Sequence, residues 1–395
     1  MQRQTAGQRL PAVLWPLMFG NVVIGMGVMV VAGLLNEIRS DLSVSVRTAG
    51  QLISSAALLV SLGAPLLAML VRRWDRRRLL VGSLVWYAGF HAAAALASGF
   101  DSLLIARALA MVSAAIFTPQ AAACIGLLVP EHQRGRGITF VFLGWSVASV
   151  LGTPLGAWIG GHFGWRWTMG LMAVLSMLSA LWLLARMPRG ILPAPLPASA
   201  WRQTLNSSTL MLTLGITVAS AAGQFVCLSY LAPYMSHRLG MGADGLSVLL
   251  LVYGACGFVG NALVSRHIDR IGATRAMGWA LGSMVLGMGL TALAQQPLTM
   301  ALALMPWGLG VFASNSSQQA RLVALAPWLA PASIALNTSA MYAGQALGAG
   351  LGGHLIEWAG MDMLPLAGCA GLLAALGLSH WASQRARHHP VRGPH

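Results

Sequence analysis

Charged side chains are scarce in this chain of 395 residues: only 8% are Asp, Glu, Lys or Arg, whereas a soluble domain carries about 25%. A soluble surface of this size cannot be built from so few charges, which excludes a large soluble protein. Lysine is missing altogether, so that every basic residue is arginine. The chain also has no GxxxxGK[ST] phosphate-binding loop, and we therefore do not expect ATP to drive it directly.

Cysteine is equally rare and is never paired. The four cysteines each stand alone in an apolar run, without the spacing of a metal site or a redox pair, so we interpret them as small buried packing residues. No Ser-His-Asp or metal-ligand spacing stands out either. The sequence therefore predicts no enzyme activity, no metal and no cofactor.

Apolar residues make up 57% of the chain, and they occur in long runs. A helix needs about 20 apolar residues to cross a bilayer. Lipid offers no partner for open backbone groups, which favours helices, and the runs are longer than the roughly ten-residue strands of a membrane barrel. The sequence predicts an all-α membrane protein with twelve transmembrane helices at 12–35, 49–71, 79–98, 103–129, 138–161, 168–184, 208–235, 246–265, 276–294, 298–311 extended to about 325, 332–356 and 363–381.

The arginines give the chain a formal net charge of +15 and are unevenly placed. Nineteen of them, including Arg321, fall in the termini and the even-numbered gaps between runs, and four fall in the odd-numbered gaps: Arg39, Arg47, Arg166 and Arg238. By the positive-inside rule, both termini and the even gaps face the cytoplasm. The basic loops then mark orientation in the cytoplasmic membrane and contact with anionic lipid, not nucleic-acid binding.

A short phrase occurs twice, as LGAWIGGH at 155–162 and LGAGLGGH at 347–354, near the ends of the fifth and eleventh runs. Arg73 and Arg270 repeat at a similar interval of 197 residues. Prolines between the halves predict an extended, non-helical linker. We therefore expect a six-helix bundle at 1–187, a cytoplasmic linker at 188–207 and a second six-helix bundle at 208–395. Parallel halves with a site at their interface are one of the known transporter architectures.

Glycines three or four residues apart let two helices approach closely. Such stripes could pack across the seam between the halves or pack within each half, and the two readings do not exclude each other. The residues that form these stripes are Gly152, Pro154, Gly156, Gly160, Gly348 and Gly352.

Three motifs carry a family resemblance. VLGTPLGAWIGGHFGWRW at 150–167 resembles a fifth-helix antiporter motif, SRHIDRIGATR at 265–275 a loop motif with Asp269, Arg270 and Arg275, and LLIARALAM at 103–111 a fourth-helix motif with Arg107. With twelve spans, the chain resembles the major facilitator superfamily, and within it the bacterial drug:proton antiporter-like efflux permeases. The resemblance implies a monomeric secondary transporter that works by alternating access, with a small molecule, protons and membrane lipid as its partners.

The first-half loop, AMLVRRWDRRRLL at 68–80, departs from the family pattern. Arg72 occupies the usual acidic position, and Asp75 occupies the usual glycine position. The resemblance implies that Arg72, Arg73, Asp75 and Arg76 form gating charge pairs that hold the inward-closed state, as do Asp269, Arg270 and Arg275 in the second half. The alternative is an arginine cluster that only sets topology.

Proton coupling is the second departure. Each of the nine acids falls in a gap or at the edge of a run, and Val28 stands where many relatives carry glutamate. Glu37 is the nearest substitute and His91 a second titratable group, although either could have an interfacial or packing role. The residues around Glu37 are typical of a solvated outer loop. A uniporter or exchanger without proton coupling therefore remains an alternative, as does a membrane-bound sensor.

The resemblance implies a central cavity lined by the first, fourth, seventh and tenth helices. Polar side chains at membrane depth are costly and mark a pathway, which makes Asn21, Arg107, Gln120, Gln224, Tyr230 and Asn315 the candidate substrate contacts. We expect Arg107 to meet the substrate or a polar partner on another cavity helix. The alternative is that its side chain snorkels to the outer surface.

Overall fold

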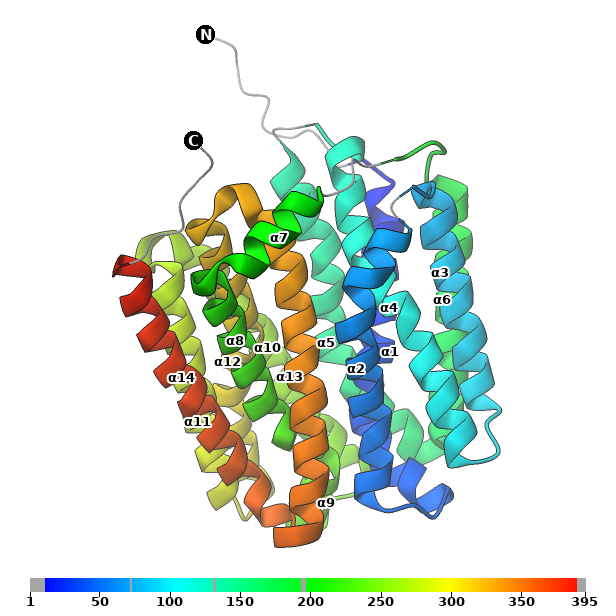
Figure 1. The fold of residues 1–395 in the computed structure, drawn as a ribbon. Helices are drawn as coiled ribbons and strands as arrows, with labels where there is room; N and C mark the ends of the chain where they lie inside the picture. Colours follow the sequence, from blue (N-terminus) through cyan, green and yellow to red (C-terminus); the bar gives the residue numbers. More distant parts are fainter. Residues whose placement is uncertain (1–10, 72, 131–132, 193–196, 389–395) are drawn as a thin grey trace.

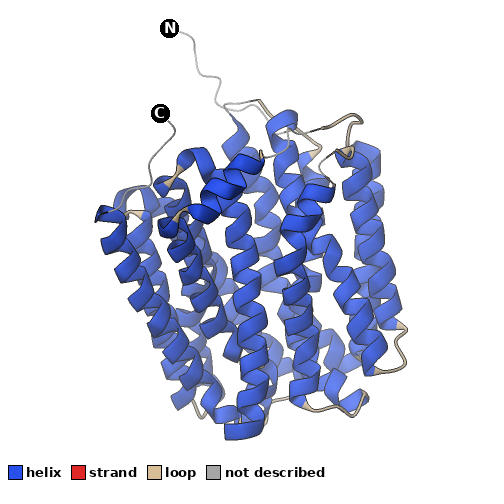
Figure 2. Ribbon diagram, viewed as in Figure 1, coloured by secondary structure: helices blue, strands red, loops and turns tan. Residues whose placement is uncertain are grey.

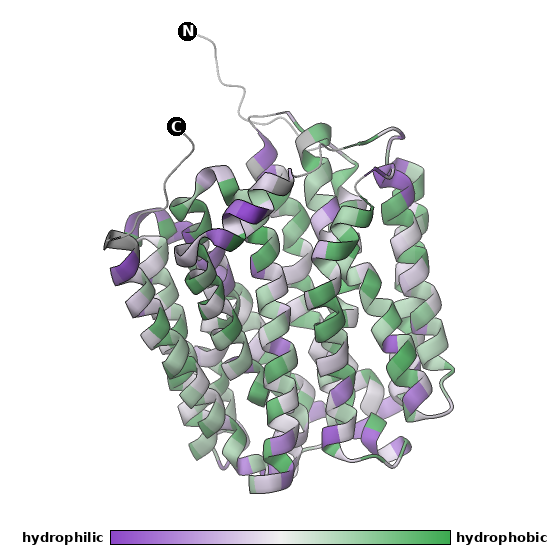
Figure 3. Ribbon diagram, viewed as in Figure 1, coloured by the Kyte–Doolittle hydropathy of each residue, from purple (hydrophilic) through white to green (hydrophobic). Residues whose placement is uncertain are grey.

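The computed structural model describes residues 11–71, 73–130, 133–192 and 197–388. Figure 2 shows helices joined by loops throughout this part of the chain. The long helices run side by side, and α1 begins at the same end of the bundle at which α14 ends (Figure 1). We call this the near end, and the opposite end, where α1 gives way to α2, the far end. Apolar residues predominate along the middle of the bundle and polar residues gather toward its two ends (Figure 3).

The first half contains six long helices: α1 (Leu14–Asp41), α2 (Val46–Leu70), α3 (Arg76–Ala95), α4 (Phe100–Leu128), α5 (Arg134–Phe163) and α6 (Trp165–Arg186). Within it α1 packs on α5, and α3 on α6 and α4. Ser45 caps α2 by accepting a hydrogen bond from the Thr48 amide. Gly164, at φ +90°, separates α5 from α6 because a residue with a side chain rarely adopts that backbone conformation.

The second half contains α8 (Ser208–Leu228), α9 (Leu231–Leu239), α10 (Ala243–Ile271), α11 (Ala273–Leu293), α12 (Pro297–Leu325), α13 (Ala330–Ala359) and α14 (Leu364–His388), with short 3-10 turns η2 (Pro327–Leu329) and η3 (Met361–Met363). Here α8 packs on α13 and α14, and α12 on α10 and α11. The seventh predicted run is split, because α8 ends at Leu228 and α9 begins at Leu231.

All twelve predicted runs are helical, and within the described residues ten helical segments are long and apolar enough to cross a membrane. This count takes α8 and α9 together. The two runs outside it, α3 and α13, are more polar, yet both lie alongside the others in the bundle (Figure 1). The first helix is longer than predicted, since α1 continues beyond Leu35 to Asp41.

The linker differs from the prediction of an extended segment, because it contains the helix α7 (Ala198–Asn206). The last proline of the linker is Pro197, which is the cap residue of α7. The nine residues of α7 contain neither proline nor glycine. Proline is tolerated at the start of a helix, where no amide donor is needed. α7 crosses the near end of the second half (Figure 1) and contacts α8 and α13.

The two halves meet mainly along two helix pairs, α2 with α13 and α5 with α10, and by a smaller contact of α1 with α9. Close backbone approach makes the second pair tight: a Cβ atom added at Gly254 of α10 would lie 2.5 Å from the carbonyl oxygen of Ser149 in α5. In the first pair, the Ser61 hydroxyl of α2 donates to the Ser339 carbonyl of α13 over 2.9 Å. The seam is therefore formed by corresponding helices of the two halves: α2 corresponds to α10, and α5 corresponds to α13.

Candidate functional site

Arg107 lies inside the bundle on α4, with only 3% of its surface exposed. Its Nη1 donates to the carbonyl oxygen of Gly27 over 2.6 Å, and its Nη2 donates to that of Val28 over 3.0 Å. Arg107 thus contacts another of the helices expected to line the cavity, through two backbone carbonyls of α1. Snorkelling to the outer surface is excluded for this conformation.

Three aromatic or imidazole side chains surround this arginine. Tyr87 and His91 come from α3, with their rings 4.2 Å apart, and the Tyr87 hydroxyl donates to the Ile24 carbonyl over 3.1 Å. Tyr342 comes from α13 of the second half and packs against the core of the first half. His91 Nδ1 lies 2.9 Å from the Tyr87 carbonyl, while its buried Nε2 has no partner within the described part of the chain.

A second arginine is also buried, contrary to its assignment to a loop. Arg321 belongs to α12 and is 4% exposed. Its guanidinium donates to the hydroxyls of Ser379 and Ser383 in α14, over 3.0 and 3.1 Å. It therefore joins two helices of the second half and does not contribute to the charge of the near-end surface.

Asn21, a predicted cavity residue, belongs to a hydrogen-bonded network in the first half. Its amide nitrogen donates to the Val141 carbonyl of α5 over 3.0 Å. Its amide oxygen accepts from the Thr118 hydroxyl of α4 over 2.8 Å, and Trp145 donates to that hydroxyl over 3.1 Å. The network joins α1, α4 and α5.

Asn315 belongs to a network at corresponding positions in the second half. The Thr217 hydroxyl of α8 donates to the amide oxygen of Asn337 in α13 over 2.6 Å. The Asn337 amide nitrogen donates to the Asn315 oxygen in α12 over 3.2 Å. Thr217, Asn315 and Asn337 follow Asn21, Thr118 and Val141 by 196 or 197 residues. Sequence reasoning missed Thr217, Asn337 and Thr118, although this interval could have revealed them.

The other predicted cavity residues are also buried. Gln120 and Gln224 are each 7% exposed, and Tyr230 is 1% exposed. The Tyr230 hydroxyl donates to the Ala349 carbonyl of α13 over 2.7 Å. Tyr230 thus anchors the break between α8 and α9 to the helix that carries the second glycine phrase.

The predicted glycine stripes pack mainly within each half and not across the seam. A Cβ atom at Gly156 would lie 2.6 Å from Val30 Cγ2 of α1. One at Gly348 would lie 2.4 Å from the Ala222 carbonyl oxygen of α8. The remaining stripe members behave alike, since Gly152 and Gly160 face α1 and Gly352 faces α8, and Pro154 lies within α5 beside them. α1 and α8 therefore fit closely into the grooves that these glycines leave.

Asp75 of the first-half loop binds backbone groups. It caps α3 by accepting from the Arg78 amide over 3.1 Å, and its other oxygen accepts from the Gly190 amide of the linker over 2.7 Å. Burial alone would raise the pKa of Asp75, but hydrogen bonds from the backbone of Arg78, Gly190 and Ile191 outweigh it and lower that pKa. Asp75 thereby fastens the start of the linker to the first half.

Of the other loop-motif residues, Arg73, Asp269, Arg270 and Arg275 make no ion pair within the described part of the chain. Arg76 is buried and donates to the Val71 and Trp74 carbonyls over 3.0 and 2.8 Å. Arg73, Asp269, Arg270 and Arg275 are exposed, and Arg72 lies outside the described residues. Four ion pairs occur among the described residues, and all four lie at the far end.

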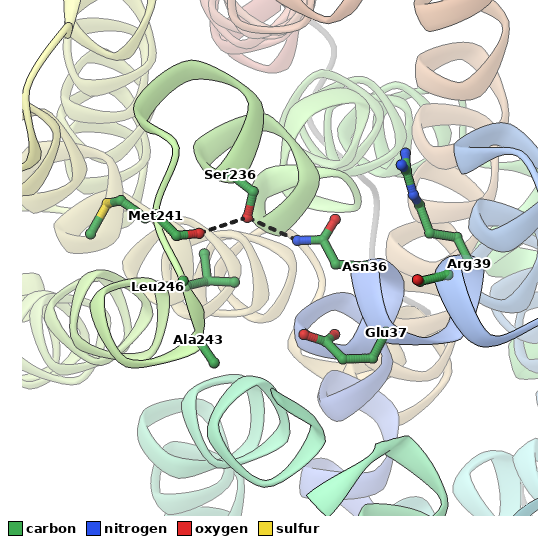
Figure 4. A pocket seen from close by; sticks show the side chains of 9 residues that line it. Asn36, Glu37, Arg39, Ser236, Met241, Ala243 and Leu246 are labelled. Carbon is green, nitrogen blue, oxygen red and sulfur yellow. Dashed lines mark hydrogen bonds between the residues drawn. The ribbon is translucent and has the colours of Figure 1, made fainter. Parts of the chain in front are cut away.

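Glu37 lies on α1 in a helical turn, not in the solvated loop predicted for it. It lines a cavity of about 310 Å³ at the far end, formed by α1, α9 and the start of α10. Figure 4 shows its carboxylate on the cavity side of α1, with Arg39 turned away, and shows Asn36 donating to Ser236 across the cavity. Glu37 Oε2 is buried and has no hydrogen-bond partner among the described residues.

Comparison with known proteins gives this arrangement a family. The model of the Major Facilitator Superfamily matches residues 17–349. This chain belongs to the major facilitator superfamily. The chain is therefore a multi-pass membrane transporter for a small molecule and not an enzyme.

The similar proteins include several with transport names. The chain is 32% identical to a chloramphenicol resistance protein of Streptomyces lividans, over 93% of this chain and 95% of that protein. It is 27% identical to an inner membrane transport protein of Escherichia coli, over 88% and 89% of the two chains. It is also 27% identical to a probable sugar efflux transporter of Pasteurella multocida, over 95% and 92%.

Solved structures agree on the fold. A bacterial homolog of the human lysosomal transporter Spinster superposes with a TM-score of 0.78 at 16% identity, over 97% of this chain and 98% of that chain. A peptide transporter, POT, in complex with alafosfalin gives a TM-score of 0.74 at 17% identity, over 98% and 96%. The chain thus shares its fold with transporters of very different sequence.

Proposed function

We propose that this transporter exports a small molecule across the cytoplasmic membrane, driven by protons that enter through Glu37. The near end then faces the cytoplasm, where the positive-inside rule puts the arginine-rich loops. Residues 1–187 and 208–395 act as the two moving bundles, joined by the segment 188–207. Export is supported by the names of the relatives that confer chloramphenicol resistance or carry sugars outward.

The observation that carries the proton-coupled part is the unpartnered oxygen of Glu37 beside the far-end cavity. A buried charge without a partner is costly, and a proton bound to this carboxylate would remove the charge. The neighbouring acid of α1, Asp41, is already hydrogen-bonded to Trp165 over 3.0 Å. Glu37 is thus the acid of α1 that is free to bind and release a proton.

Arg107 lies too far from Glu37 in this structure to release a proton from its carboxyl group by direct contact. Ten residues of α1 separate Gly27 from Glu37, a rise of about 15 Å in a helix. Any coupling between the carboxylate and Arg107 would therefore pass through movement of α1 itself. Such movement would break the hydrogen bonds of Arg107 to the Gly27 and Val28 carbonyls.

The test begins by finding a substrate. Purified protein is screened for thermal stabilisation by chloramphenicol and by a panel of sugars, because a ligand of the folded state raises its stability by mass action. The stabilising compound is then used in vesicles that contain a pH-sensitive dye. We expect it to drive proton movement in the wild type and to drive none in Glu37→Gln.

Asp101→Asn is the matched control, since Asp101 is an exposed acid at the same end, in the first turn of α4. We expect it to leave proton movement unchanged. Equal proton movement in wild type and Glu37→Gln would eliminate Glu37 as the carrier. Substrate movement without any proton movement in the wild type would favour a uniporter or an exchanger.

A further inference from the structure

The last three residues of each repeated phrase, Gly160–His162 and Gly352–His354, have corresponding surroundings in the two halves. The first glycine of each faces its own half. A Cβ atom at Gly160 would lie 2.3 Å from Leu34 of α1, and one at Gly352 would lie 2.4 Å from the Val226 carbonyl of α8. These glycines thus continue the stripes along α5 and α13.

The second glycine of each phrase reaches the opposite half. A Cβ atom at Gly161 would lie 2.2 Å from the Cβ of Ala243, at the start of α10. One at Gly353 would lie 2.7 Å from the Tyr230 hydroxyl oxygen of its own half and 3.1 Å from Cγ of Arg47, at the start of α2. A side chain at either position would be crowded, so that the glycines let the two halves meet closely at the far end.

The histidine of each phrase then contacts a charged residue of the opposite half. His162 Nε2 lies 3.5 Å from the Asp244 carboxylate at the start of α10. Arg47 of α2 donates from Nη2 to His354 Nε2 over 3.0 Å, and from Nη1 to Glu357 of the same helix, α13. Gly-Gly-His therefore joins α5 to α10 and α13 to α2, which are the two helix pairs of the seam.

We propose that the two Gly-Gly-His segments, with Asp244, Arg47 and Glu357, form a twin latch that holds the far end closed and must release each time that end opens. The role of the latch in alternating access rests on the proposed transport function. The contacts that hold the far end closed do not depend on that function. The two contacts explain the repeated phrase. Its early glycines allow a helix of the same half to pack closely, and its last residues bind the other half.

The strength of these contacts suits a latch that opens repeatedly. The Arg47 and Glu357 side chains are 37% and 47% exposed, and those of His162 and Asp244 are 39% and 76% exposed. Ion pairs at such exposure change an equilibrium by about fivefold at most. The two together therefore shift the ratio of closed to open states by up to about 25-fold, because the pairs lie on separate helix pairs and add.

The experiment measures the far-end separation directly, without substrate and without transport. Nitroxide labels are attached at Leu96→Cys and Leu298→Cys, after the four native cysteines are replaced by serine. Leu96 follows α3 and Leu298 begins α12, so that they report on opposite halves; they are 84% and 70% exposed. Pulsed electron paramagnetic resonance then gives the distribution of distances between the labels.

We expect the combined variant Arg47→Gln with Asp244→Ala to move the distribution toward longer distances. The charge swap Arg47→Glu with Glu357→Arg should keep the short distance, and it provides a second test should the combined variant fail to fold. Asp362→Asn is the matched control, since it breaks the Arg238–Asp362 pair of 3.1 Å at the same end but inside the second half.

An unchanged distribution in the combined variant would overturn the latch. So would an equal shift in Asp362→Asn, because loss of any far-end ion pair would then have the same effect. A swap variant that opens as far as the combined variant would show that the pairing of charges is immaterial. Failure of transport in any of these proteins would not alter the measured distances, which keeps the latch distinguishable from the proposed export.

Discussion

Arg107 is held by the backbone of Gly27: its Nη1 donates to the Gly27 carbonyl oxygen over 2.6 Å, from one helix to another inside the bundle. Gly27 also lies against α3, since a Cβ atom there would lie 2.2 Å from the Tyr87 hydroxyl oxygen. The cation is thus stabilised by backbone dipoles of α1. A helix that slides or tilts must break these hydrogen bonds, which makes Arg107 sensitive to movement of α1.

Replacing Arg107 should therefore impair both stability and transport. Arg107→Ala removes two hydrogen bonds from a charged donor to α1 carbonyls, worth about 1.5–3 kcal/mol each, and we expect a lower melting temperature and loss of transport. Arg107→Lys should restore little, because an ammonium lacks the planar fork that reaches two carbonyls at once. Melting curves and vesicle uptake are the measurements, with the exposed Arg266→Ala as control. Wild-type behaviour of Arg107→Ala would contradict this role.

The close packing of Gly156 and Gly348 can be tested against Gly350, a glycine of the second phrase that has open space around it. Gly156→Leu and Gly348→Leu place a side chain against Val30 and against the Ala222 backbone, and overpacking of this kind costs about 1–3 kcal/mol or more. Gly350 lies in the same phrase as Gly348, but a Cβ atom there would meet nothing within 4 Å. We expect insertion to persist in all three variants, with thermal stability and transport reduced only in the first two. An equal loss in Gly350→Leu would argue for helix propensity as the cause.

Asp75 should protect the linker from protease. Asp75→Ala removes the acceptor of the Gly190 amide and the cap of α3, a loss of about 1 kcal/mol for the cap alone. We expect trypsin to cleave faster after the neighbouring Arg189 in Asp75→Ala than in the wild type. The ratio of the two half-length fragments to intact chain measures this, and Arg78→Gln, which keeps the backbone donor, serves as control. Unchanged cleavage would show that the linker is fastened by other contacts.

The lowered pKa of Asp75 sets the direction of a pH effect. Because the folded-state pKa is below the unfolded value of about 3.9, the contribution of Asp75 to stability is complete above that value. It is lost as the pH falls through the folded-state pKa. We expect the wild type to lose its advantage in melting temperature over Asp75→Asn only below about pH 4. A difference between the two that grows with falling pH would contradict the sign.

The polar network of the second half predicts strongly coupled mutations. Asn337→Leu leaves Thr217 and Asn315 without their partner and should cost about 1–3 kcal/mol. Thr217→Val removes one hydrogen bond and should cost about 1 kcal/mol. Because the residues share the network, the double variant should lose less than the sum of the single losses. Additive losses in denaturant or thermal unfolding would show that the hydrogen bond is unimportant.

The sequence by itself determined that twelve apolar runs are helical, where most of them begin and end, and that they form two halves. Apolar runs of sufficient length can only be helices in lipid, so composition fixes the class of structure. The repeated glycine phrase marked the corresponding helices α5 and α13, because small residues are needed wherever backbones approach closely. For Arg107 the sequence left two outcomes open, burial with internal partners or snorkelling to the outer surface.

Only the tertiary structure decided which neighbour each side chain meets. Hydropathy records the average surroundings of a segment and not its rotation about its own axis, so it could not tell that Gly156 faces α1 while Gly161 faces α10. It also placed Glu37 in a loop, because charged residues near a run look solvated whether or not the helix continues past the apolar part. The residues that surround Glu37, Arg107 and His162 come from segments far away in the chain. Their positions depend on the packing of the whole bundle, which no local pattern records.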